Sequence, residues 1–562
     1  MQHHLPIRNK IIIMLSVMAS LFLVALDQTI VTTALGKIVE DFHAYDSLSW
    51  VVTAYLLTTT VTVPIAGKLS DLFGRRIVLL VGVMLFGLAS LGSGMSGDIN
   101  QLVLWRAAQG IGGGIITANA FTIIGDLFAA RERGKWQGMI GAVFGLSSLV
   151  GPLLGGWLTD HQNILGLVTD WRWNFYINVP IALAALAVIA IFCPPLRHST
   201  KPRIDYVGAA LLTIALATLV LAVDNTETIF ADVMKQWSLS LTELRMIMAG
   251  IVIAATSAFV WVERRSKEPI LPLRFFKNRT YVLIMIVASF FGVGFMGAIV
   301  YLTQFNQQVF EASPTTSGLM LMPMVAGLML SSVGSGQLIS KTGKYMVFMR
   351  VGIVLSAAMV AMLTTLTPES PYWHEAVMMV VLGFGLGLVM PIMNIAVQNE
   401  FEQNELGVAT SSIQLFRGLG STIGIAVFGA MLTSGLTTHL ANIEQTAYLQ
   451  QLKTAPAVKQ LGSLSDSNTL LLLNSPEMKQ KVTDGFTAST SGLPAQLKQK
   501  VQSEFATTQA EFSTKIVHAF SDSLHKLFMT AAVLMAAAVP FVFAVKERTL
   551  KKTSAAITPG EL

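Results

Sequence analysis

Gly67-Lys-Leu-Ser-Asp71-Leu-Phe-Gly74-Arg75-Arg76 is a short, charged, glycine-bearing stretch between two apolar runs, residues 48–66 and 77–95. Each run is close to the ~20 apolar residues that an α-helix needs to cross the hydrocarbon core of a bilayer. Few loops of soluble proteins have this pattern. The stretch therefore indicates a tight polar connection between two membrane-spanning helices.

The composition of the whole chain is that of a polytopic membrane protein. Of the 562 residues, 53% are hydrophobic and 12% are charged, whereas an average soluble domain has roughly 25% charged residues. The net charge of +6 does not indicate nucleic-acid binding, because the basic residues lie in short loops and not on a soluble face. The single cysteine, Cys193, excludes an intrachain disulfide, and the nine histidines have no metal-ligand spacing. We therefore expect no cofactor.

Fourteen apolar stretches are long enough to span a membrane. They lie near residues 11–34, 48–67, 77–96, 101–124, 137–159, 175–194, 205–223, 246–263, 280–302, 315–338, 346–366, 374–397, 409–432 and 524–546. The first stretch follows basic residues, as in a signal peptide, but it continues to about Leu35 without a small-residue cleavage site. We interpret it as a retained first helix, and the even number of spans puts both termini on one side.

Lysine and arginine predict which side that is, because cytoplasmic loops carry an excess of both. One set of loops and tails contains most of the basic residues, including the 67–76 stretch. The short loops of the opposite set contain only Lys37, Arg172, Lys235 and Arg245. We therefore expect a multi-pass protein of the cell (inner or plasma) membrane with both termini in the cytoplasm.

A weaker copy of the opening stretch follows the tenth span. Residues 336–345, Gly-Gln-Leu-Ile-Ser-Lys-Thr-Gly-Lys-Tyr, keep the Gly-x-Leu-x-x-x-x-Gly-basic frame but lack the aspartate. Two related halves predict a pseudo-twofold transporter with its site between them, although glycine and a basic residue are also common at helix ends. The predicted domains are a six-helix bundle (1–194), linkers with an inserted helix pair (195–279) and a second six-helix bundle (280–562).

Residues 437–523, between spans 13 and 14, form the longest segment outside the predicted spans, on the outer side. Ser475-Pro476-Glu477 resembles the start of a helix. Apolar residues from Leu497 to Leu524 recur at steps of four or seven. We expect the last membrane helix to extend outward as an amphipathic stalk that folds against a partner helix. The segment could cap the exit, dock another protein or act as a spacer.

Asp27 lies well inside the first span, where an ionised carboxylate costs ~2.5–3.5 kcal/mol on insertion scales. Such a residue must face a cavity or a partner. Burial favours the neutral form of a carboxyl group and a nearby cation favours the charged form, so this site could exchange a proton for a cationic substrate. Arg106, at a similar depth in the fourth span, is the natural counter-charge. The alternatives are a structural ion pair near the outer interface and an arginine that extends to the surface.

The fifth span contains a proline among several glycines: Gly145, Gly151, Pro152, Gly155 and Gly156. Proline removes a helical hydrogen bond, and glycine flattens the helix surface. This helix should therefore bend and pack closely against a neighbour.

Together these stretches resemble motifs of the major facilitator superfamily, in particular its fourteen-span drug:proton antiporter branch. Residues 67–76 resemble the family's signature loop, and residues 145–156 resemble the antiporter motif. The chain resembles further motifs of the family at residues 26–35, 106–114, 171–180 and 407–418. The likeness covers nearly the whole membrane portion except residues 437–523. It implies an all-α major facilitator fold with 14 transmembrane helices, in two six-helix bundles plus an inserted helix pair.

The resemblance also implies roles for individual residues. Asp27 would be the proton-coupling carboxylate, Arg106 its tuning cation and residues 145–156 a conformational hinge. The cytoplasmic gate would comprise Gly67, Asp71, Gly74, Arg75, Arg76, Asp126 and Arg131. The chain departs from the family at Gly36, where proline is common, which would loosen the outer end of the first span.

Substrate contacts are less apparent in the sequence. Polar candidates within the spans are Tyr55, Asn119, Gln304, Asn306, Asn394 and Gln398, each of which could instead bond a neighbouring helix. The 27 methionines could line an adaptable apolar cavity. Asp27 is the single carboxylate that we place deep in a span, which favours monocations or neutral amphiphiles over dications.

We predict an antiporter, driven by the proton gradient, that exports hydrophobic and often cationic drugs or dyes by alternating access. Its partners would be these substrates, protons and membrane lipids, with a possible extracytoplasmic partner at residues 437–523. An exporter of one lipid, siderophore or antibiotic-like metabolite is the nearest alternative. A membrane-embedded enzyme is disfavoured, because the spans lack paired catalytic carboxylates, a His-Glu metal pattern and a nucleophile elbow. A sensor acting through residues 437–523 is a further alternative.

Overall fold

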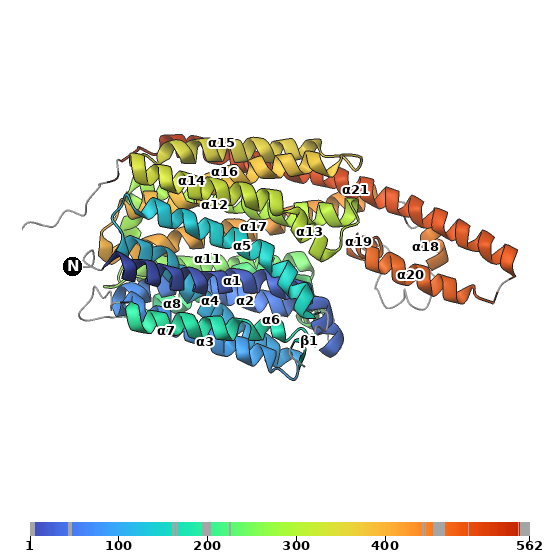
Figure 1. Ribbon diagram of the computed structural model, residues 1–562, viewed down its shortest axis with the longest axis horizontal. Coiled ribbons are helices and arrows are strands. Elements are labelled where there is room, and N and C mark those ends of the chain that lie inside the picture. The colour runs from blue at the N-terminus through green and yellow to red at the C-terminus, as the bar shows by residue number, and fades with distance from the viewer. Residues whose placement is uncertain are drawn as a thin grey trace, which may run out of the picture.

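The computed structural model describes residues 6–42, 48–159, 163–164, 167–193, 204–223, 226–440, 443, 446–452, 467–492, 494–548 and 550. These residues form a bundle of long helices with a slender extension at one end (Figure 1). Fourteen helices in the described part are long and apolar enough to cross a membrane, which confirms the predicted number.

The first six spans pack as one group. They are α1 (Ile7–Phe42), α2 (Leu48–Phe73), α3 (Arg75–Gly94), α4 (Ile99–Leu127), α5 (Arg133–Thr159) and a sixth span divided into α6 (Trp173–Tyr176) and α7 (Asn178–Phe192). Strands β1 (Asn163–Ile164) and β2 (Leu167–Val168) pair antiparallel before α6, with Asn163 opposite Val168. Helix α1 packs against α5, α7 and α4, while α2 and α3 pack against α4.

The last six spans form the second group. They are α12 (Arg279–Val309), α14 (Met322–Thr342), α15 (Met346–Met362), α16 (Tyr372–Gln398), α17 (Leu406–His439) and α21 (Ala495–Ala544). Three short helices lie between these spans. Helix α13 (Pro314–Met320) precedes α14, η4 (Leu363–Thr365) follows α15, and η5 (Gln403–Glu405) precedes α17. Helix α12 packs against α17 and α21, while α16 packs against α14 and α15.

The inserted pair consists of α8 (Tyr206–Val223) and α11 (Leu241–Glu263), joined by α9 (Thr226–Ile229) and α10 (Ala231–Trp237), and η3 (Leu273–Lys277) leads on to α12. Helix α8 packs against α11 and also contacts α2 of the first group and α17 of the second. The pair therefore lies along the seam between the two groups. The predicted domain boundary at residues 194 and 195 lies outside the described residues.

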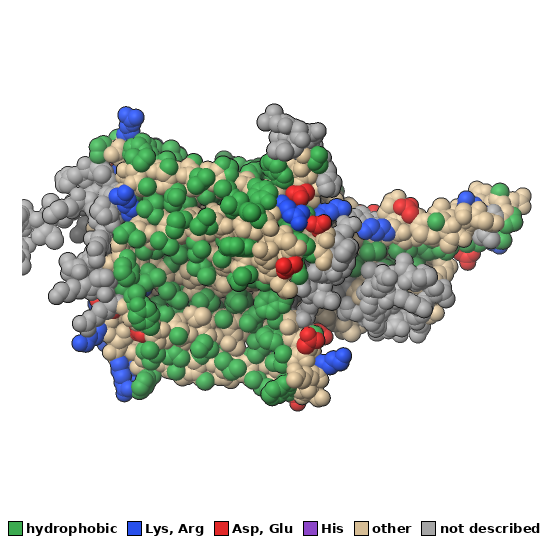
Figure 2. All heavy atoms as spheres, turned by 90° about the horizontal axis from the view of Figure 1, so that it is seen from below, with side chains coloured by type: hydrophobic (Ala, Val, Ile, Leu, Met, Phe, Trp, Pro, Cys, Tyr) green, Lys and Arg blue, Asp and Glu red, His purple; other side chains and the backbone are tan. Residues whose placement is uncertain are grey.

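The side of the bundle is apolar, and charged side chains gather at its two ends (Figure 2). Leu104, Ile191 and Leu330 are each about 70% exposed (69%, 72% and 70%). Exposed apolar surface on this scale is unfavourable in water but suits lipid. We call the end where α1 begins and α21 ends the basic end, and the opposite end the extension end.

The extension confirms the predicted stalk. Helix α21 has 50 residues, and its first part lies beyond the bundle beside α20 (Pro476–Ser489) (Figure 1). Phe486 of α20 stacks on Phe505 of α21, with ring centroids 3.9 Å apart. Short helices α18 (Ala447–Leu452) and α19 (Ser467–Leu473) complete the extension. Lys479 forms a 2.5 Å ion pair with Glu311, just after α12, and so ties the extension to the bundle.

Several helices extend beyond the predicted spans. Helix α1 covers Ile7–Phe42 where 11–34 was predicted, and α17 covers Leu406–His439 where 409–432 was predicted. Hydropathy detects only the part of a helix that suits hydrocarbon, whereas backbone hydrogen bonds continue through polar turns. The sixth span, by contrast, is not one continuous helix, because it is interrupted at Ile177.

The two repeated loops share an unusual backbone feature. Gly74 has a φ of 95° and Gly343 a φ of 75°, and these are the glycines with positive φ in the described part of the chain. Residues with a Cβ rarely adopt this conformation. The last glycine of the repeated frame therefore has a positive φ in both halves, which supports the internal repeat.

Candidate functional site

Asp27 is completely buried in α1, and its exposed fraction is 0%. Its Oδ2 atom accepts a 2.5 Å hydrogen bond from Nη1 of Arg106. Its Oδ1 atom accepts hydrogen bonds from Nε2 of Gln109 at 2.7 Å and Nδ2 of Asn178 at 3.1 Å. Helices α4 and α7 thus supply one cation and two amides to a carboxylate of α1. These donors offset the cost of burying its charge.

The guanidinium of Arg106 is held inside the bundle and does not extend to the surface. It is 2% exposed, and its Nε atom donates to the carbonyl of Val51 at 3.2 Å. The guanidinium carbon lies 4.4 Å from the ring centroid of Tyr55 and 5.7 Å from that of Phe175, within range of cation–π attraction. Tyr55, a candidate substrate contact in the sequence, therefore belongs to the surroundings of the Asp27–Arg106 pair.

Sequence reasoning missed three members of this cluster: Ser90, Gln109 and Asn178. Gln109 accepts from Nη1 of Arg106 at 2.7 Å and donates to the hydroxyl of Ser90 at 2.8 Å. Its position one turn after Arg106 puts it on the same helix face, a signal that the sequence contains. Nothing in the sequence singles out Ser90.

A second carboxyl group, Glu375 in the first turn of α16, is also 0% exposed. The side-chain amide of Asn306 in α12 has one orientation in which both its oxygen and its nitrogen have hydrogen-bond partners. In that orientation the nitrogen donates to the two carboxyl oxygens of Glu375 at 2.8 and 3.0 Å. Glu375 is thus a second buried carboxyl group, in the first turn of its helix, that sequence reasoning missed. Asn306 is the hydrogen-bond partner of Glu375, whereas the sequence had suggested Asn306 as a substrate contact.

The burial of Glu375 comes from residues that lie elsewhere in the chain. The hydroxyl of Tyr372 donates to the carbonyl of Met320 in α13 at 2.8 Å, and the Tyr372 ring packs edge-on against Phe310. In the sequence Glu375 lies at the edge of an apolar run, next to polar residues. Such a position indicates a side chain at the membrane surface. The argument for monocations over dications considered Asp27 alone and did not include this second buried carboxyl group.

At the basic end, Arg75 joins two carboxylates of the first half. It is 0% exposed, and its Nε atom bonds Oδ2 of Asp126 at 2.8 Å. It also forms an ion pair with Asp71 and a 2.5 Å hydrogen bond to the hydroxyl of Ser70. The first residue of α3 thus connects the ends of α2 and α4.

Asp71 also reaches the second half. Its Oδ1 accepts from the N–H of Gly407 at 3.0 Å, and its Oδ2 accepts from the N–H of Val408 at 2.9 Å. These two N–H groups lie in the first turn of α17, where the helix itself supplies no acceptor for them. The helix dipole also favours a negative charge at this end. A Cβ on Gly67 would lie 2.6 Å from the Cβ of Ser411, so this glycine permits the contact.

The remaining predicted gate residues have different partners. Gly74 has the positive φ that residues with a Cβ rarely adopt. Arg76 donates to the carbonyl of Ala190 in α7 and is therefore apart from the Asp71 network. Arg131 donates to the carbonyl of Lys341, in the repeat loop of the other half. Sequence reasoning missed Arg133, whose Nη2 donates to the carbonyl of Gly125 at 2.7 Å.

Helix α5 faces α14 of the second half with a row of glycines: Gly134, Gly138, Gly141 and Gly145. A Cβ on Gly134 would lie 2.9 Å from the carbonyl oxygen of Gly336, and one on Gly145 would lie 2.8 Å from Cγ of Met329. Gly138 and Gly141 both pack against Ser332. Their spacing of three and four puts them on one face, and only Gly145 was singled out from the sequence.

The proline of α5 lies next to α1. Thr29 donates to the carbonyl of Ser147 at 3.2 Å, one residue before the carbonyl that Pro152 leaves without a helical donor. A Cβ on Gly151 would lie 2.6 Å from Cβ of Thr29. Gly155 and Gly156 follow one turn later, where Gly155 is buried. The helix that carries Asp27 is thus bonded to the predicted hinge.

The other substrate-contact candidates are engaged in part. Asn119 donates to the carbonyl of Ile115 on its own helix at 2.8 Å, and Asn394 accepts from Gln414 at 3.4 Å. Gln398 of α16 donates to the carbonyl of Phe121 in α4 at 3.0 Å and so bridges the two halves. Within the described residues, some buried amide oxygens have no hydrogen-bond partner, namely those of Asn119, Gln304, Gln398 and Gln414.

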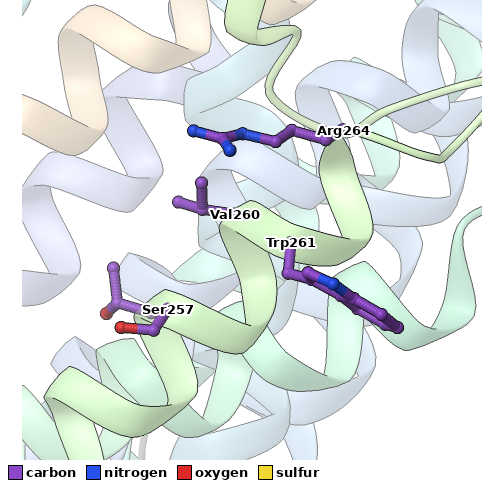
Figure 3. A pocket seen from close by; sticks show the side chains of 5 residues that line it. Ser257, Val260, Trp261 and Arg264 are labelled. Carbon is purple, nitrogen blue, oxygen red and sulfur yellow. The ribbon is translucent and has the colours of Figure 1, made fainter.

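Two surface pockets lie apart from all these residues. One of about 390 Å³ lies on α11 and is lined by Thr256, Ser257, Val260, Trp261 and Arg264 (Figure 3). The other, of about 480 Å³, lies between the end of α17 and the stalk and is lined in part by His439, His518 and Asp522. Neither is lined by a residue predicted for the site.

Comparisons with known proteins agree with this architecture. Residues 17–425 match the model of the Major Facilitator Superfamily. Multidrug transporter protein MdtP of Bacillus subtilis (strain 168) is 34% identical over 549 residues, 97% of this chain and 95% of that protein. Multidrug resistance protein 3 of the same organism is 35% identical over 430 residues, 76% of this chain and 80% of that protein. A bacterial homologue of the human lysosomal transporter Spinster, solved inward-facing and unoccupied, has a TM-score of 0.55 at 14% identity and covers 96% of this chain and 97% of that structure, a likeness of fold alone.

Proposed function

The chain belongs to the major facilitator superfamily and is a multi-pass membrane transporter, not an enzyme, and we propose that it exports hydrophobic, often cationic compounds in exchange for protons. The names of its relatives support drug export. The observation that carries proton coupling is the completely buried Asp27, with Arg106 as its counter-charge. The basic end would face the cytoplasm, in line with the distribution of lysine and arginine.

Protonation of Asp27 would change the forces between three helices. The ionised carboxylate holds donors from α4 and α7 through its two oxygens. A proton removes its charge and occupies one of these acceptor sites, which weakens the attraction to Arg106. Helix α1 is then free to shift relative to α4. Exchange of one proton for one monovalent cation is electroneutral and would draw on the pH gradient alone.

The hydrogen bond from Thr29 to Ser147 offers a route from this event to the hinge. A shift of α1 moves the backbone of α5 next to Pro152, where the helix lacks a hydrogen bond and bends most easily. Beyond that point α5 packs on α14 through its glycine row. Bending α5 would therefore change the contact between the two halves, which is what alternating access requires.

Substrates would meet amide groups between the halves. The unpartnered oxygens of Asn119, Gln398 and Gln414 are acceptors on α4, α16 and α17. Acceptors of this kind suit the N–H groups of protonated amines.

The test is efflux of the dye cation ethidium from proteoliposomes with an imposed pH gradient. We expect Asp27→Asn to abolish pH-driven efflux, because an amide cannot exchange a proton. The matched control is Asp41→Asn in the same helix, where the side chain is 48% exposed and pairs with Arg172; it should keep wild-type coupling. Efflux by Asp27→Asn that still follows the pH gradient would refute the assignment.

Export of one specific amphiphile with an anionic group is a second candidate, favoured by Arg417. This residue lies within α17, is partly exposed and forms no ion pair among the described residues. A cation there could hold a carboxylate or phosphate. A panel of cationic and anionic substrates in the same vesicles discriminates: one saturable anionic substrate and indifference to ethidium would favour this candidate.

A further inference from the structure

The internal repeat relates two polar pairs that lie toward the extension end. In the first half, Asp27 of the first helix contacts Arg106 of the fourth. In the second half, Asn306 of the first helix (α12) contacts Glu375 of the fourth (α16). The same pair of helices thus carries a buried carboxyl group in each half, but on opposite members of the pair. Among the described residues, the first carboxyl group forms an ion pair with a cation and the second does not.

The part of the chain that the structure describes offers Glu375 no ion-pair partner. Among the described residues, no lysine, arginine or histidine forms an ion pair with it. Two titratable residues lie close to it in the sequence of its own helix: the hydroxyl of Tyr372 is bonded to the carbonyl of Met320, and the ring of His374 lies beside that of Trp373.

The helices and segments around α16 place their charges elsewhere. At the basic end lie Arg133 and Lys135 of α5, Arg279 of α12, Lys341 of α14 and Arg350 of α15. Arg417 and His439 of α17 make no recorded contact with Glu375. At the extension end Glu311 pairs with Lys479, His518 with Glu369, and His525 bonds the carbonyl of Leu366.

A carboxyl group in such a place favours its neutral form, because an isolated buried charge has no partner to offset its desolvation. Asn306 can bond Glu375 in either protonation state. Its N–H group can donate to an ionised carboxylate, and its carbonyl, after rotation of the amide, can accept from a neutral carboxyl group. The pair therefore tolerates a proton that comes and goes.

From this geometry we infer that Glu375 is a second proton-binding group of the transport cycle. The inference rests on the proposed proton-coupled export. Glu375 holds its proton while the halves are in contact at the basic end, as Asp71 and Gly407 are in this structure, and releases it to the cytoplasm when the halves open toward that side. Together with Asp27 it brings two protons in for each substrate exported. Exchange of two protons for one monovalent cation moves one net positive charge inward.

The test measures whether a membrane potential drives export. The full-length protein is placed in proteoliposomes, and valinomycin sets the potential without a pH gradient; the probe is ethidium. When one net positive charge moves inward per cycle, a potential of 100 mV, negative on the cytoplasmic side, changes the steady-state ratio of ethidium concentrations across the membrane by about 50-fold. We expect this response in the wild type. Glu375→Gln should lose it and keep the response to a pH gradient.

The control is Glu369→Gln, six residues earlier, where the side chain is 69% exposed. It should respond to both gradients like the wild type. Wild-type export that follows the pH gradient but ignores the potential would overturn this inference and leave the proposed function intact; this outcome needs no variant. A full potential response in Glu375→Gln would overturn it as well. Wild-type export indifferent to both gradients would instead refute proton coupling itself.

Discussion

Asp27 and Glu375 are equally buried, but their neighbours differ. Asp27 has a guanidinium and two amides within 3.1 Å, whereas Glu375 has one amide. A carboxylate next to a cation keeps its charge at low cost, while one beside an amide alone is more stable when neutral. The two buried carboxyl groups thus differ in how many donors surround them and in whether one of these donors is a cation.

Gln109→Met tests the surroundings of Asp27. Methionine is of similar size but cannot donate, so the ionised carboxylate loses one hydrogen bond, of the kind worth ~1.5–3 kcal/mol when one partner is charged. Protonation becomes easier, and we expect the pH profile of ethidium efflux to move to higher pH. The measurement is the efflux rate between pH 5.5 and 8.5. Gln101→Met, at an exposed position near the start of the same helix, is the control; an unchanged profile in Gln109→Met would contradict the role of this amide.

At the scale of elements, contact between the halves depends on close backbone approach. Helix α5 presents small residues to α14 along several turns. Association of helices in lipid gains little from apolar burial, so tight van der Waals packing at such small residues is what stabilises it. The same property makes the contact easy to break and reform during a transport cycle.

Gly138→Ala should disturb this contact with a single methyl group. The added Cβ would collide with the backbone of Ser332, which has no flexible end to move aside. We expect an efflux rate lower by about fivefold or more, by analogy with overpacking costs of ~1–3 kcal/mol. Gly334→Ala in α14 is the matched control, because nothing lies within 4 Å of its Cβ position. Equal efflux in both variants would show that close α5–α14 approach is not needed.

At the scale of the whole molecule, the two halves are joined asymmetrically at the basic end. In the first half Asp71, Arg75 and Asp126 form a buried network that caps α17. In the second half the repeat loop lacks the aspartate, and the C-terminal segment takes part instead: Arg548 pairs with Glu400 at 3.1 Å. Of the two repeated loops, as far as the structure describes them, the first-half loop is the one that bonds a helix of the opposite half with a carboxylate.

Asp71→Asn should weaken this closure. An amide oxygen can accept from one N–H group of α17, but it carries no charge for the helix dipole or for Arg75. We expect slower efflux with ethidium binding retained, and faster hydrogen exchange at residues 406–410. The measurements are vesicle efflux, ethidium binding in detergent and hydrogen exchange by mass spectrometry. Lys68→Gln in the same loop, where the lysine pairs with Glu268, should resemble the wild type. Unchanged exchange and transport in Asp71→Asn would remove Asp71 from the gate.

Local features of the sequence predicted the membrane helices, their order, the repeat and the stalk, because apolar runs, glycine frames and helical spacing are properties of short stretches. Asp27 and Arg106 were recognisable for the same reason, since each is a charge inside an apolar run. Their partners Ser90 and Asn178 were not, because a serine or an asparagine near a helix end has many uses.

Glu375 marks the boundary between what the sequence by itself determined and what only the tertiary structure decided. Hydropathy assigns the end of a helix to the membrane surface, and by that criterion Glu375 is solvated. Its actual burial depends on Asn306 of α12 and on contacts of Tyr372 with Met320 and Phe310, which come from another part of the chain. The cost of burying a charge is set by these neighbours in space, and so the choice between a surface glutamate and a buried carboxyl group was made only when the helices packed.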